Sequence, residues 1–358
     1  MADGARVGAL TDTLSAAPHI WVLQAEKAGD NAQVDTVVDA VGLPVTVKRL
    51  RMRPRWQHGK PRIRAGLSHL DLAASDALEP PWPDLVIASG RRLMNVALWL
   101  RQQSAGRTRL VLVGRPHGHD DAFDLIVAAP QFQMPPRPNV LNLTLPLLMP
   151  PRAAIEQSAR AWQERLADLP RPLTAVLVGG PTRPFRFGAA EAQELIARTL
   201  AATAADGSLY VSTSRRTPPA VVDALIAALP AGARLFRWAP QVADNPYLAL
   251  LGLADRFVVT GDSASMLVEV ARLGKPLAVF ELPVEPRQRF IARARGLLSC
   301  AWRRPQRDLA ALHHVLYRSG LARPLDAGFS GVTARADATA ELAQIRSRVR
   351  ALLHLCPT

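Results

Sequence analysis

The stretch Val258-Val259-Thr260-Gly261-Asp262-Ser263-Ala264-Ser265-Met266-Leu267-Val268-Glu269 joins a short apolar strand to a helix through a small polar turn. A buried strand that runs through such a turn into a helix is the repeating unit of a parallel α/β sheet. Gly274-Lys275-Pro276 ends the helix, because glycine readily adopts the left-handed cap conformation and proline cannot continue a helix. The polar turn is therefore expected at the carboxyl edge of a sheet, where open α/β sheets bind ligands.

The same alternation of strand and helix extends over the rest of the chain, and Pro146, Pro150 and Pro151 divide it into two series. We expect two doubly wound, Rossmann-like domains that face a central cleft, over residues 17–150 and 151–321. A helix over 334–354 is expected to pack back on the first domain, and residues 1–16 and 322–333 are expected to be loose. The predicted strands cover 19–24, 44–47, 84–88, 109–113, 124–127 and 140–143 in the first domain, and 174–178, 209–211, 234–236, 257–259 and 277–280 in the second. The predicted helices cover 31–41 and 91–103, then 152–168, 189–203, 218–229, 246–252 and 263–273.

Length and composition fit this reading: the chain has 358 residues, of which 49% are hydrophobic. No apolar run is long enough to span a membrane, and the N-terminus lacks the pattern of a secretory signal. Cys300 and Cys356 are too few for a disulfide framework. We therefore expect a cytoplasmic protein.

The formal net charge is +14, and all but four of the 44 basic residues are arginine. Eight cations and no acid occur between Lys48 and Arg64. Such a segment attracts anions, which could be those of an anionic acceptor substrate or of the inner leaflet of a membrane. The alternative is a solvated loop in an arginine-rich protein. No nucleic-acid-binding motif accompanies the charge, so nucleic acid is not an expected partner.

Three polar turns follow strands in the second domain. In the first, Asp262, Ser263 and Ser265 crowd a helix start that favours a phosphate, although the charge of Asp262 would repel it unless the side chain points elsewhere. Glu269 lies almost two helical turns on and is placed to meet a ribose diol. The alternative is an ordinary capped helix with a solvated glutamate.

The second turn contains Gly179-Gly180, which permits close backbone approach to a ligand. The third, Ser212-Thr213-Ser214-Arg215-Arg216-Thr217, combines hydroxyls with guanidinium groups that suit a diphosphate. Each turn also has an alternative interpretation without a ligand. The Gly179-Gly180 turn resembles many strand–helix turns, and the third turn could be a helix cap with exposed arginines. All three turns follow strands of one domain, so they should meet at one edge of its sheet.

Other site signals are weak. His117-Gly118-His119-Asp120-Asp121 has some metal-ligand character, but the spacing is unspecific and no metal site is predicted. The chain has no Gly-x-Ser-x-Gly elbow of a serine hydrolase. His313-His314 lies on a predicted helix and is expected to serve packing or the surface.

Several motifs, in order along residues 20–285, together resemble the mitochondrial fission factor family, which comprises the plant elongated-mitochondria protein and its bacterial relatives. They are Ala28-Gly29-Asp30-Asn31-Ala32-Gln33, Pro83-Asp84-Leu85-Val86-Ile87-Ala88-Ser89-Gly90-Arg91-Arg92, Phe123-Asp124-Leu125-Ile126-Val127, Pro138-Asn139-Val140-Leu141, Val178-Gly179-Gly180-Pro181, Thr213-Ser214-Arg215-Arg216-Thr217, Asn245-Pro246-Tyr247 and Thr260-Gly261-Asp262-Ser263 through Glu269. Two positions depart from many relatives: Asp30 stands where they have His, and Gly261 stands where they have an acid.

The family is similar to GT-B glycosyltransferases, so the resemblance implies a GT-B-like fold, a nucleotide-diphosphate sugar as donor and no metal or cofactor. Bacterial relatives are often described as nucleoside-diphosphate-sugar epimerases. This chain has neither Gly-x-Gly-x-x-Gly nor Tyr-x-x-x-Lys, which argues against that activity.

Two hypotheses follow: a glycosyltransferase of cell-envelope polysaccharide or glycolipid synthesis, or a non-catalytic scaffold that recruits a protein partner. In the first, Asp30 is the general base, Glu269 binds ribose, and Ser214, Arg215, Ser263 and Ser265 bind the diphosphate. The further candidates for substrate contact are Gly29, Asn31, Gln33, Gly90, Arg91, Gly179, Gly180, Ser212, Arg216, Asp262 and Met266.

Overall fold

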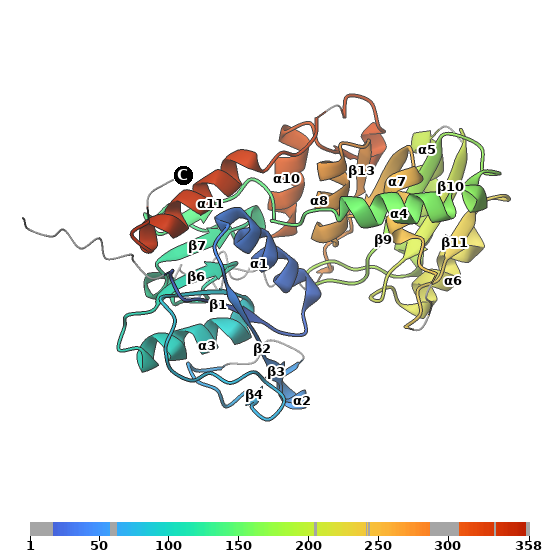
Figure 1. Ribbon diagram of the computed structural model, residues 1–358. Helices are drawn as coiled ribbons and strands as arrows, with labels where there is room; N and C mark the ends of the chain where they lie inside the picture. Colours follow the sequence, from blue (N-terminus) through green and yellow to red (C-terminus); the bar gives the residue numbers. More distant parts are fainter. Residues whose placement is uncertain are drawn as a thin grey trace, which may run out of the picture.

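The computed structural model of the chain describes residues 17–57, 63–203, 206–240, 242, 244–286, 308–332 and 334–355. These residues form two six-stranded parallel sheets and a small two-stranded ribbon. Figure 1 shows the two large sheets side by side, each with its own helices. Cys300 and Cys356 and residues 1–16, for which the sequence carried expectations, lie outside the described residues.

The first sheet has the strand order β2-β1-β5-β6-β7-β8. Its strands are β1 (Ile20–Gln24), β2 (Thr46–Arg49), β5 (Leu85–Ser89), β6 (Arg109–Val113), β7 (Leu125–Ala128) and β8 (Val140–Asn142). The helical elements that follow these strands are α1 (Ala28–Val41), α3 (Gly90–Gln103), η1 (Asp120–Ala122) and η2 (Pro130–Phe132).

The second sheet has the strand order β11-β10-β9-β12-β13-β14. Its strands are β9 (Leu173–Val178), β10 (Ser208–Thr213), β11 (Arg234–Phe236), β12 (Arg256–Thr260), β13 (Leu277–Phe280) and β14 (Arg323–Pro324). Its helical elements are α4 (Arg152–Trp162), η3 (Glu164–Leu166), α5 (Ala189–Thr203), α6 (Pro219–Ala228), α7 (Tyr247–Leu253), α8 (Ala264–Leu273), α10 (Leu309–Arg318) and η5 (Leu325–Ala327).

Each sheet has one point at which the order of strands reverses. In the first sheet it lies between β1 and β5, and in the second between β9 and β12. At such a switch point the chain leaves neighbouring strands in opposite directions and opens a crevice beyond their carboxyl ends. Asp30 and Gly90 lie just past the strands of the first switch point, and Gly179 and Asp262 lie just past those of the second.

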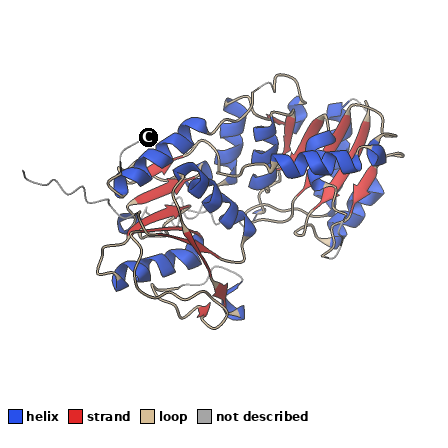
Figure 2. Ribbon diagram, viewed as in Figure 1, coloured by secondary structure: helices blue, strands red, loops and turns tan. Residues whose placement is uncertain are grey.

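Apolar residues alternate between the two faces of each strand, because successive side chains of a strand point to opposite sides. In β5, Leu85 and Ile87 pack against α1, whereas Val86 and Ala88 pack with α3. Figure 2 shows the result, with helices on both faces of each large sheet. This two-sided burial explains why the strands read as continuous apolar runs.

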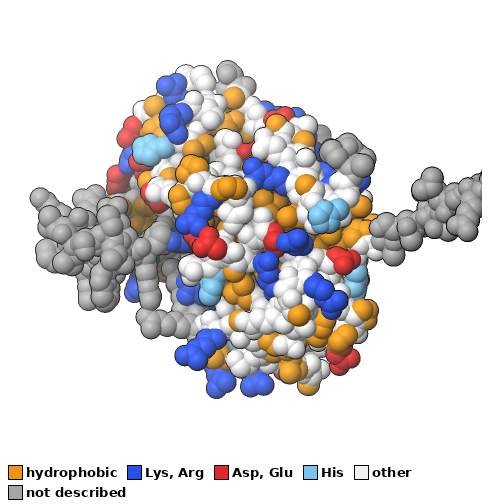
Figure 3. Space-filling model, turned by 90° about the vertical axis from the view of Figure 1, so that its left-hand side faces the viewer, with side chains coloured by type: hydrophobic (Ala, Val, Ile, Leu, Met, Phe, Trp, Pro, Cys, Tyr) orange, Lys and Arg blue, Asp and Glu red, His pale blue; other side chains and the backbone are white. Residues whose placement is uncertain are grey.

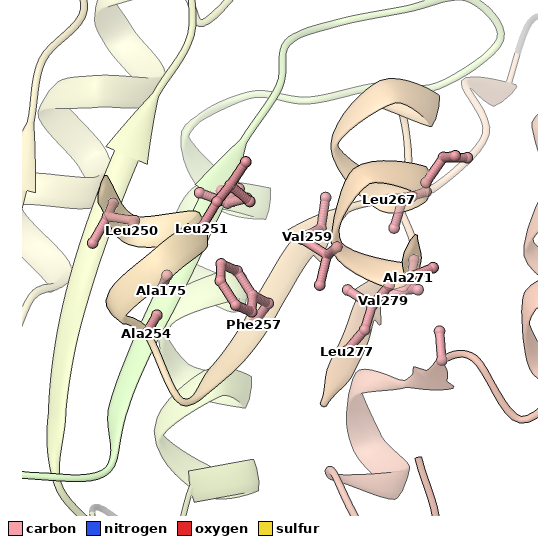
Figure 4. Close-up of a cluster of buried hydrophobic side chains, with 14 of the residues drawn as sticks. Ala175, Leu250, Leu251, Ala254, Phe257, Val259, Leu267, Ala271, Leu277 and Val279 are labelled. Carbon is pink, nitrogen blue, oxygen red and sulfur yellow. The ribbon is translucent and has the colours of Figure 1, made fainter. Parts of the chain in front are cut away.

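The second domain repeats this arrangement. Phe257 and Val259 of β12 point into a cluster with Leu250 and Leu251 of α7 and Leu267 of α8 (Figure 4). On the opposite face, β12 contributes Val258 to a cluster beneath α5 and α6. The helix α8, which begins at the polar turn after β12, is therefore held firmly against its sheet.

The helix α11 (Thr339–Leu352) returns from the second domain to the first. Its buried Ile345 and Val349 join the cluster formed by α1 and the first sheet, and Arg346 donates from Nε to the Ala40 carbonyl at 2.7 Å. Near the crossing between domains, buried Arg272 donates to the Pro146 carbonyl at 3.1 Å. The two domains are thus connected by packing as well as by the chain.

A small antiparallel ribbon of β3 (Arg51–Met52) and β4 (Leu70–Asp71), with α2 (Pro54–Gln57), extends from the first sheet. Met52 of β3 and Leu70 of β4 are buried in the core cluster of the first sheet. No sequence pattern predicts these elements, because two-residue strands lack a measurable periodicity.

Three predictions of secondary structure are corrected. The strand predicted over 44–47 is β2, Thr46–Arg49, which begins after Pro44. The helix predicted over 152–168 ends as α4 at Trp162 and continues as η3. Residues 322–333 were expected to be loose, but Arg323–Ala327 form β14 and η5, because buried Leu325 anchors them to the second sheet. Across the described residues, no helix is long and apolar enough to cross a membrane.

Replacing Ile345 by Ala will lower the free energy of unfolding by about 2–5 kcal/mol, because the lost side-chain carbons leave a cavity between α11 and α1. Thermal unfolding measured by calorimetry and circular dichroism checks this expectation. The matched control is Gln344→Ala on the exposed side of the same helix, which should change stability by less than about 0.5 kcal/mol. Equal effects of the two substitutions would contradict the packing role of α11.

Candidate functional site

The first switch point brings Asp30 against Gly90. Asp30 lies in the first turn of α1, its side chain is 35% exposed, and its Oδ2 lies 4.0 Å from Lys27 Nζ. Gly90 begins α3 with φ +80°, and a Cβ at this position would lie 2.9 Å from Asp30 Oδ2. Glycine is required at position 90 on both counts, since other residues rarely adopt this φ and their Cβ would meet the carboxylate.

The neighbours of Asp30 stabilise the turn between β1 and α1. Asn31 donates from Nδ2 to the Ala25 carbonyl at 2.7 Å and accepts from the Ala25 amide at 3.3 Å. Gln33 donates to the Gly29 carbonyl at 3.2 Å, and Gly29 is exposed with open space around it. Asn31 and Gln33 therefore have structural hydrogen bonds that the sequence did not anticipate.

A cavity of about 510 Å³ opens beside Asp30. Asn31, Gly90 and Arg91 also line it, and Arg215 reaches it from the second domain. Arg91 Nη2 lies 3.0 Å from Nδ1 of His117, a residue of the loop that follows β6. The structure thus brings predicted residues from both domains to one cavity. The remaining lining residues are Ala25, Glu26, Lys27, Met52, Gln57, Ser89, Arg92 and Leu93.

At the second switch point, the carboxylate of Asp262 joins the polar turns. It accepts from the Gly180 amide at 3.0 Å and from Thr260 Oγ1 at 2.8 Å, and it pairs with Arg216 Nη1 at 2.9 Å. Its side chain has no exposed surface. A Cβ on Gly179 would lie 2.4 Å from Asp262 Oδ2, so the carboxylate occupies the space that this glycine leaves. The side chain therefore points into the network of turns formed by Gly180, Thr260 and Arg216.

The turn after β10 closes onto the same network. Ser214 Oγ donates to the Gly179 carbonyl at 3.0 Å, and Thr217 Oγ1 donates to the same carbonyl at 2.5 Å. A Cβ on Gly180 would lie 2.1 Å from the Arg216 carbonyl, so the two turns are in close contact. Ser212 is inside β10 and only 2% exposed. Arg215 alone among these residues extends out of the network towards the cavity.

The start of α8 carries the remaining polar candidates. Ser263 is the N-cap residue and is buried, but its side chain makes no capping hydrogen bond. Ser265 is exposed in the first turn, whereas Met266 packs partly against the core. The first amide groups of an α-helix lack partners within the helix, so this start presents donors to an anion.

Glu269 is paired with a residue to which the sequence assigned no role. Tyr247, at the start of α7, donates its hydroxyl to Glu269 Oε2 at 2.6 Å. Burial raises the pKa of Glu269, and the hydrogen bond from Tyr247 lowers it by a smaller amount. Burial, followed by the charge and hydrogen bond of Glu269, raises the pKa of Tyr247 well above its usual range. The motif Asn245-Pro246-Tyr247 was the only signal for this contact.

His313 explains the glycine at position 261. Its Nε2 lies 2.8 Å from the Gly261 carbonyl, and a Cβ on Gly261 would lie 2.6 Å from the His313 ring. A side chain at position 261 would displace this buried histidine. His313 therefore serves packing, as expected from its place on a helix.

Several cations of the basic segment take part in local structure. Lys48 donates to the Ala77 carbonyl at 2.8 Å and lies over the Trp21 ring, and Arg53 donates to the Leu70 carbonyl at 2.8 Å. Lys60 and Arg62 lie outside the described residues. On the face drawn in Figure 3, Lys and Arg side chains are interleaved with acidic and hydrophobic ones. Within the described part of the chain, no three His, Cys, Asp or Glu side chains gather as a metal-ligand set.

Comparison with solved structures shows the fold. A Listeria monocytogenes protein assigned as a UDP-N-acetylglucosamine 2-epimerase aligns with a TM-score of 0.53 and 11% identity, over 96% of this chain and 99% of its own. The UDP-GlcNAc 2-epimerase of Methanocaldococcus jannaschii gives a TM-score of 0.51 and 11% identity, over 94% and 99%. The fold is GT-B-like, with two Rossmann-like domains. Since epimerases share it, the absence of Gly-x-Gly-x-x-Gly and Tyr-x-x-x-Lys does not exclude epimerisation on this fold.

Comparison of sequences shows the family. Mitochondrial fission protein ELM1 of Arabidopsis thaliana is 29% identical over 228 residues, which cover 58% of this chain and 53% of the plant protein. Uncharacterized protein RP120 of Rickettsia prowazekii is 24% identical over 240 residues, which cover 58% of this chain and 67% of that protein. The chain thus spans about half the length of the plant relative. The family described as "Mitochondrial fission ELM1" matches residues 28–350. This chain therefore belongs to the mitochondrial fission ELM1 family.

Proposed function

We propose that this chain binds a nucleoside-diphosphate sugar between its two sheets and transfers the sugar to an acceptor, as a GT-B-type glycosyltransferase of cell-envelope polysaccharide or glycolipid synthesis. The observation that carries the proposal is the cavity of about 510 Å³ that Asp30 and Gly90 share with Arg215 of the other domain. It lies beyond the switch point of the first sheet, which is the usual place for a ligand in an open α/β sheet.

The donor is assigned to the second domain. Tyr247 occupies one oxygen of the Glu269 carboxylate and orients the group, which leaves the other oxygen to accept from a ribose hydroxyl. The start of α8, with Ser263 and Ser265, faces the diphosphate in this assignment. The network around Asp262 holds the neighbouring turns in shape without contacting the donor.

Arg215 and Asp30 supply the chemistry. As the bond between sugar and diphosphate breaks, negative charge grows on the diphosphate, and the guanidinium of Arg215 stabilises it. Asp30 takes the proton of the acceptor hydroxyl, whose oxygen attacks the anomeric carbon from the opposite face and inverts its configuration.

A non-catalytic scaffold is the second candidate. The observation that favours it is the degree to which polar groups of the second domain already bond to each other: Asp262 with Arg216, and Ser214 with Gly179. A scaffold that retains the GT-B fold needs these contacts for stability, and it would recruit a protein partner instead of a donor.

A thermal-shift panel of UDP, GDP, CDP, ADP and dTDP, each with and without a sugar, tests donor binding. One member should raise the melting temperature, because a ligand specific for the folded state stabilises it by mass action. Glu269→Gln should weaken that ligand about tenfold, the loss expected for one hydrogen bond to a charged group. Glu156→Gln, on the exposed face of α4, is the control. A flat panel at millimolar ligand would favour the scaffold.

Donor affinity should decrease as the pH is lowered towards the pKa of an ordinary glutamate, about 4.3, and the decrease should begin above that value. Burial raises the folded-state pKa of Glu269, so its carboxylate is protonated at a higher pH than an ordinary glutamate and stops accepting from ribose. A nucleotide sugar is the appropriate ligand, since its diphosphate does not titrate in this range. Calorimetric titration of wild type and Glu269→Gln checks this; parallel pH profiles would exclude Glu269 as the titrating group.

Asp30→Asn should retain donor affinity and lower transfer by about 100-fold or more, because the amide cannot take the acceptor proton. The measurement is release of nucleoside diphosphate from the donor in the presence of an extract that supplies the acceptor. Asp39→Asn, on the exposed side of the same helix, is the matched control and should leave the rate unchanged. Full activity of Asp30→Asn would show that another group is the base.

A further inference from the structure

Three arginines of the basic segment are held on the solvent side of the first domain. Arg49, Arg51 and Arg53 are exposed, whereas Leu50 and Met52 between them are only 2% and 3% exposed. Successive residues of an extended chain point to opposite sides, so the two apolar side chains pack in the core while the three cations face outward. The fold itself therefore presents this charge to solvent.

These cations have few contacts within the protein. Among the described residues, the guanidinium groups of Arg49 and Arg51 make no hydrogen bond or ion pair. Arg53 donates from Nε to a backbone carbonyl of β4 at 2.8 Å, and the Arg55 guanidinium lies 5.4 Å from the centre of the Trp56 ring. None of the four arginines forms an ion pair with a described acid, so their charge is available to an anion outside the chain.

Two acids of the same region leave an excess of positive charge. Asp71 stands opposite Arg51 in the ribbon of β3 and β4 but forms no ion pair with it among the described residues. Asp76 accepts from the backbone amide of Arg49 at 2.7 Å, so its carboxylate serves the turn. Four exposed guanidinium groups thus stand against two carboxylates.

An exposed apolar tip lies beside the arginines. Leu72, Ala73 and Ala74 follow β4 directly and are all exposed, Leu72 by 54%. The next residue, Ser75, accepts through its hydroxyl from the Arg51 amide at 2.9 Å, which holds the tip next to the cations. Cations beside an exposed aliphatic side chain match the interface of a bilayer, where the cations meet headgroup phosphates and the aliphatic group meets the acyl boundary.

The same short strand borders the cavity beside Asp30. Met52, whose neighbours Arg51 and Arg53 face solvent, lines this cavity together with Gln57. In Figure 1, β3, β4 and α2 lie at the lower end of the molecule. A surface bound at this end would therefore be separated from the cavity by one strand.

We propose that one face of the first domain docks on an anionic lipid bilayer. This cationic face consists of Arg49, Arg51, Arg53, Arg55 and Leu72. The docking itself requires no transfer reaction; only its consequence rests on the proposed function, in that a lipid-linked acceptor would reach Asp30 from the side of Met52. Nucleic acid offers the same phosphate chemistry, but the apolar tip favours a bilayer, because a charged nucleic-acid backbone gives an aliphatic side chain no apolar surface to enter.

Sedimentation with vesicles tests the proposal on the full chain. Wild type should bind vesicles of equal parts phosphatidylcholine and phosphatidylglycerol about tenfold or more tightly than vesicles of phosphatidylcholine alone. Binding should decrease at about 1 M salt, where the Debye length is about 3 Å. Absence of binding, or equal binding to the two kinds of vesicle, overturns the proposal.

Two double variants with the same loss of charge locate the surface. Arg49→Gln with Arg51→Gln should weaken binding to the anionic vesicles about tenfold or more, since each cation near a charged membrane adds to the attraction. Arg160→Gln with Arg318→Gln, at exposed positions of α4 and α10, should leave binding nearly unchanged. Equal losses would attribute binding to the net charge of +14 and overturn the cationic face. Melting temperatures establish that every variant is folded.

Leu72→Gln distinguishes a bilayer from nucleic acid. This variant keeps the charge and removes an exposed aliphatic side chain, so it should weaken vesicle binding about threefold or more. Wild type and Leu72→Gln are also titrated with a duplex DNA. Tighter binding to DNA than to anionic vesicles at equal phosphate concentration, unchanged in Leu72→Gln, would assign the face to nucleic acid and overturn the proposal.

Nucleotide binding separates a failure of this proposal from a failure of the glycosyltransferase. The Arg49→Gln and Arg51→Gln double variant should keep any thermal shift that a nucleotide causes in wild type. Vesicle binding without nucleotide binding supports the docking face and contradicts the transferase. Nucleotide binding without vesicle binding supports the donor site and overturns the docking face.

Discussion

The carboxylate of Asp262 accepts from an amide and a hydroxyl and pairs with a guanidinium, and the turns of the second domain depend on this buried charge. Removing a carboxylate from water costs on the order of several kcal/mol, which is offset only when its lone pairs are filled. Gly180, Thr260 and Arg216 fill them here. Gly180 follows β9, Arg216 follows β10 and Thr260 is the last residue of β12, so one side chain connects the ends of these three strands at the switch point. Gly179 is required for the same reason, since a Cβ there would overlap the carboxylate.

The first domain has a similar pair in a different environment. Asp30 follows β1 and lies against Gly90, which follows β5, just as Asp262 lies against Gly179 across the other switch point. The difference is solvent: the side chain of Asp30 is 35% exposed and faces a cavity, whereas that of Asp262 has no exposed surface. A buried, paired carboxylate serves the fold. An exposed one beside a cavity is accessible to a ligand, so the same local geometry supports structure in the second domain and, in the proposed function, chemistry in the first.

Few polar groups in the turns of the second domain are left to bind a ligand, because the network around Asp262 uses most of them. Hydroxyls and glycines after β9 and β10 are mostly bonded to each other, so a donor would meet the start of α8, the second oxygen of Glu269 and Arg215. The chain belongs to a family named for mitochondrial fission, and it shares its fold with a UDP-GlcNAc 2-epimerase. Neither the family nor the fold specifies which ligand these groups would bind. The proposed function therefore depends on a few side chains around the cavity and not on the fold itself.

Sequence alone determined the alternation of strands and helices, the parallel sheets and the edge at which the polar turns lie, because apolar runs and turn residues act over short distances. Strand β6, helix α5 and strand β13 have the bounds predicted for them. Tertiary structure decided what depends on strand order: that Asp262 points to Gly180, that Tyr247 reaches Glu269, and that Arg215 crosses to the cavity of the first domain. It also decided that Leu325 anchors β14 and η5 where a loose segment was expected. These contacts join residues far apart in the chain, and the sequence has no local pattern that specifies such pairs.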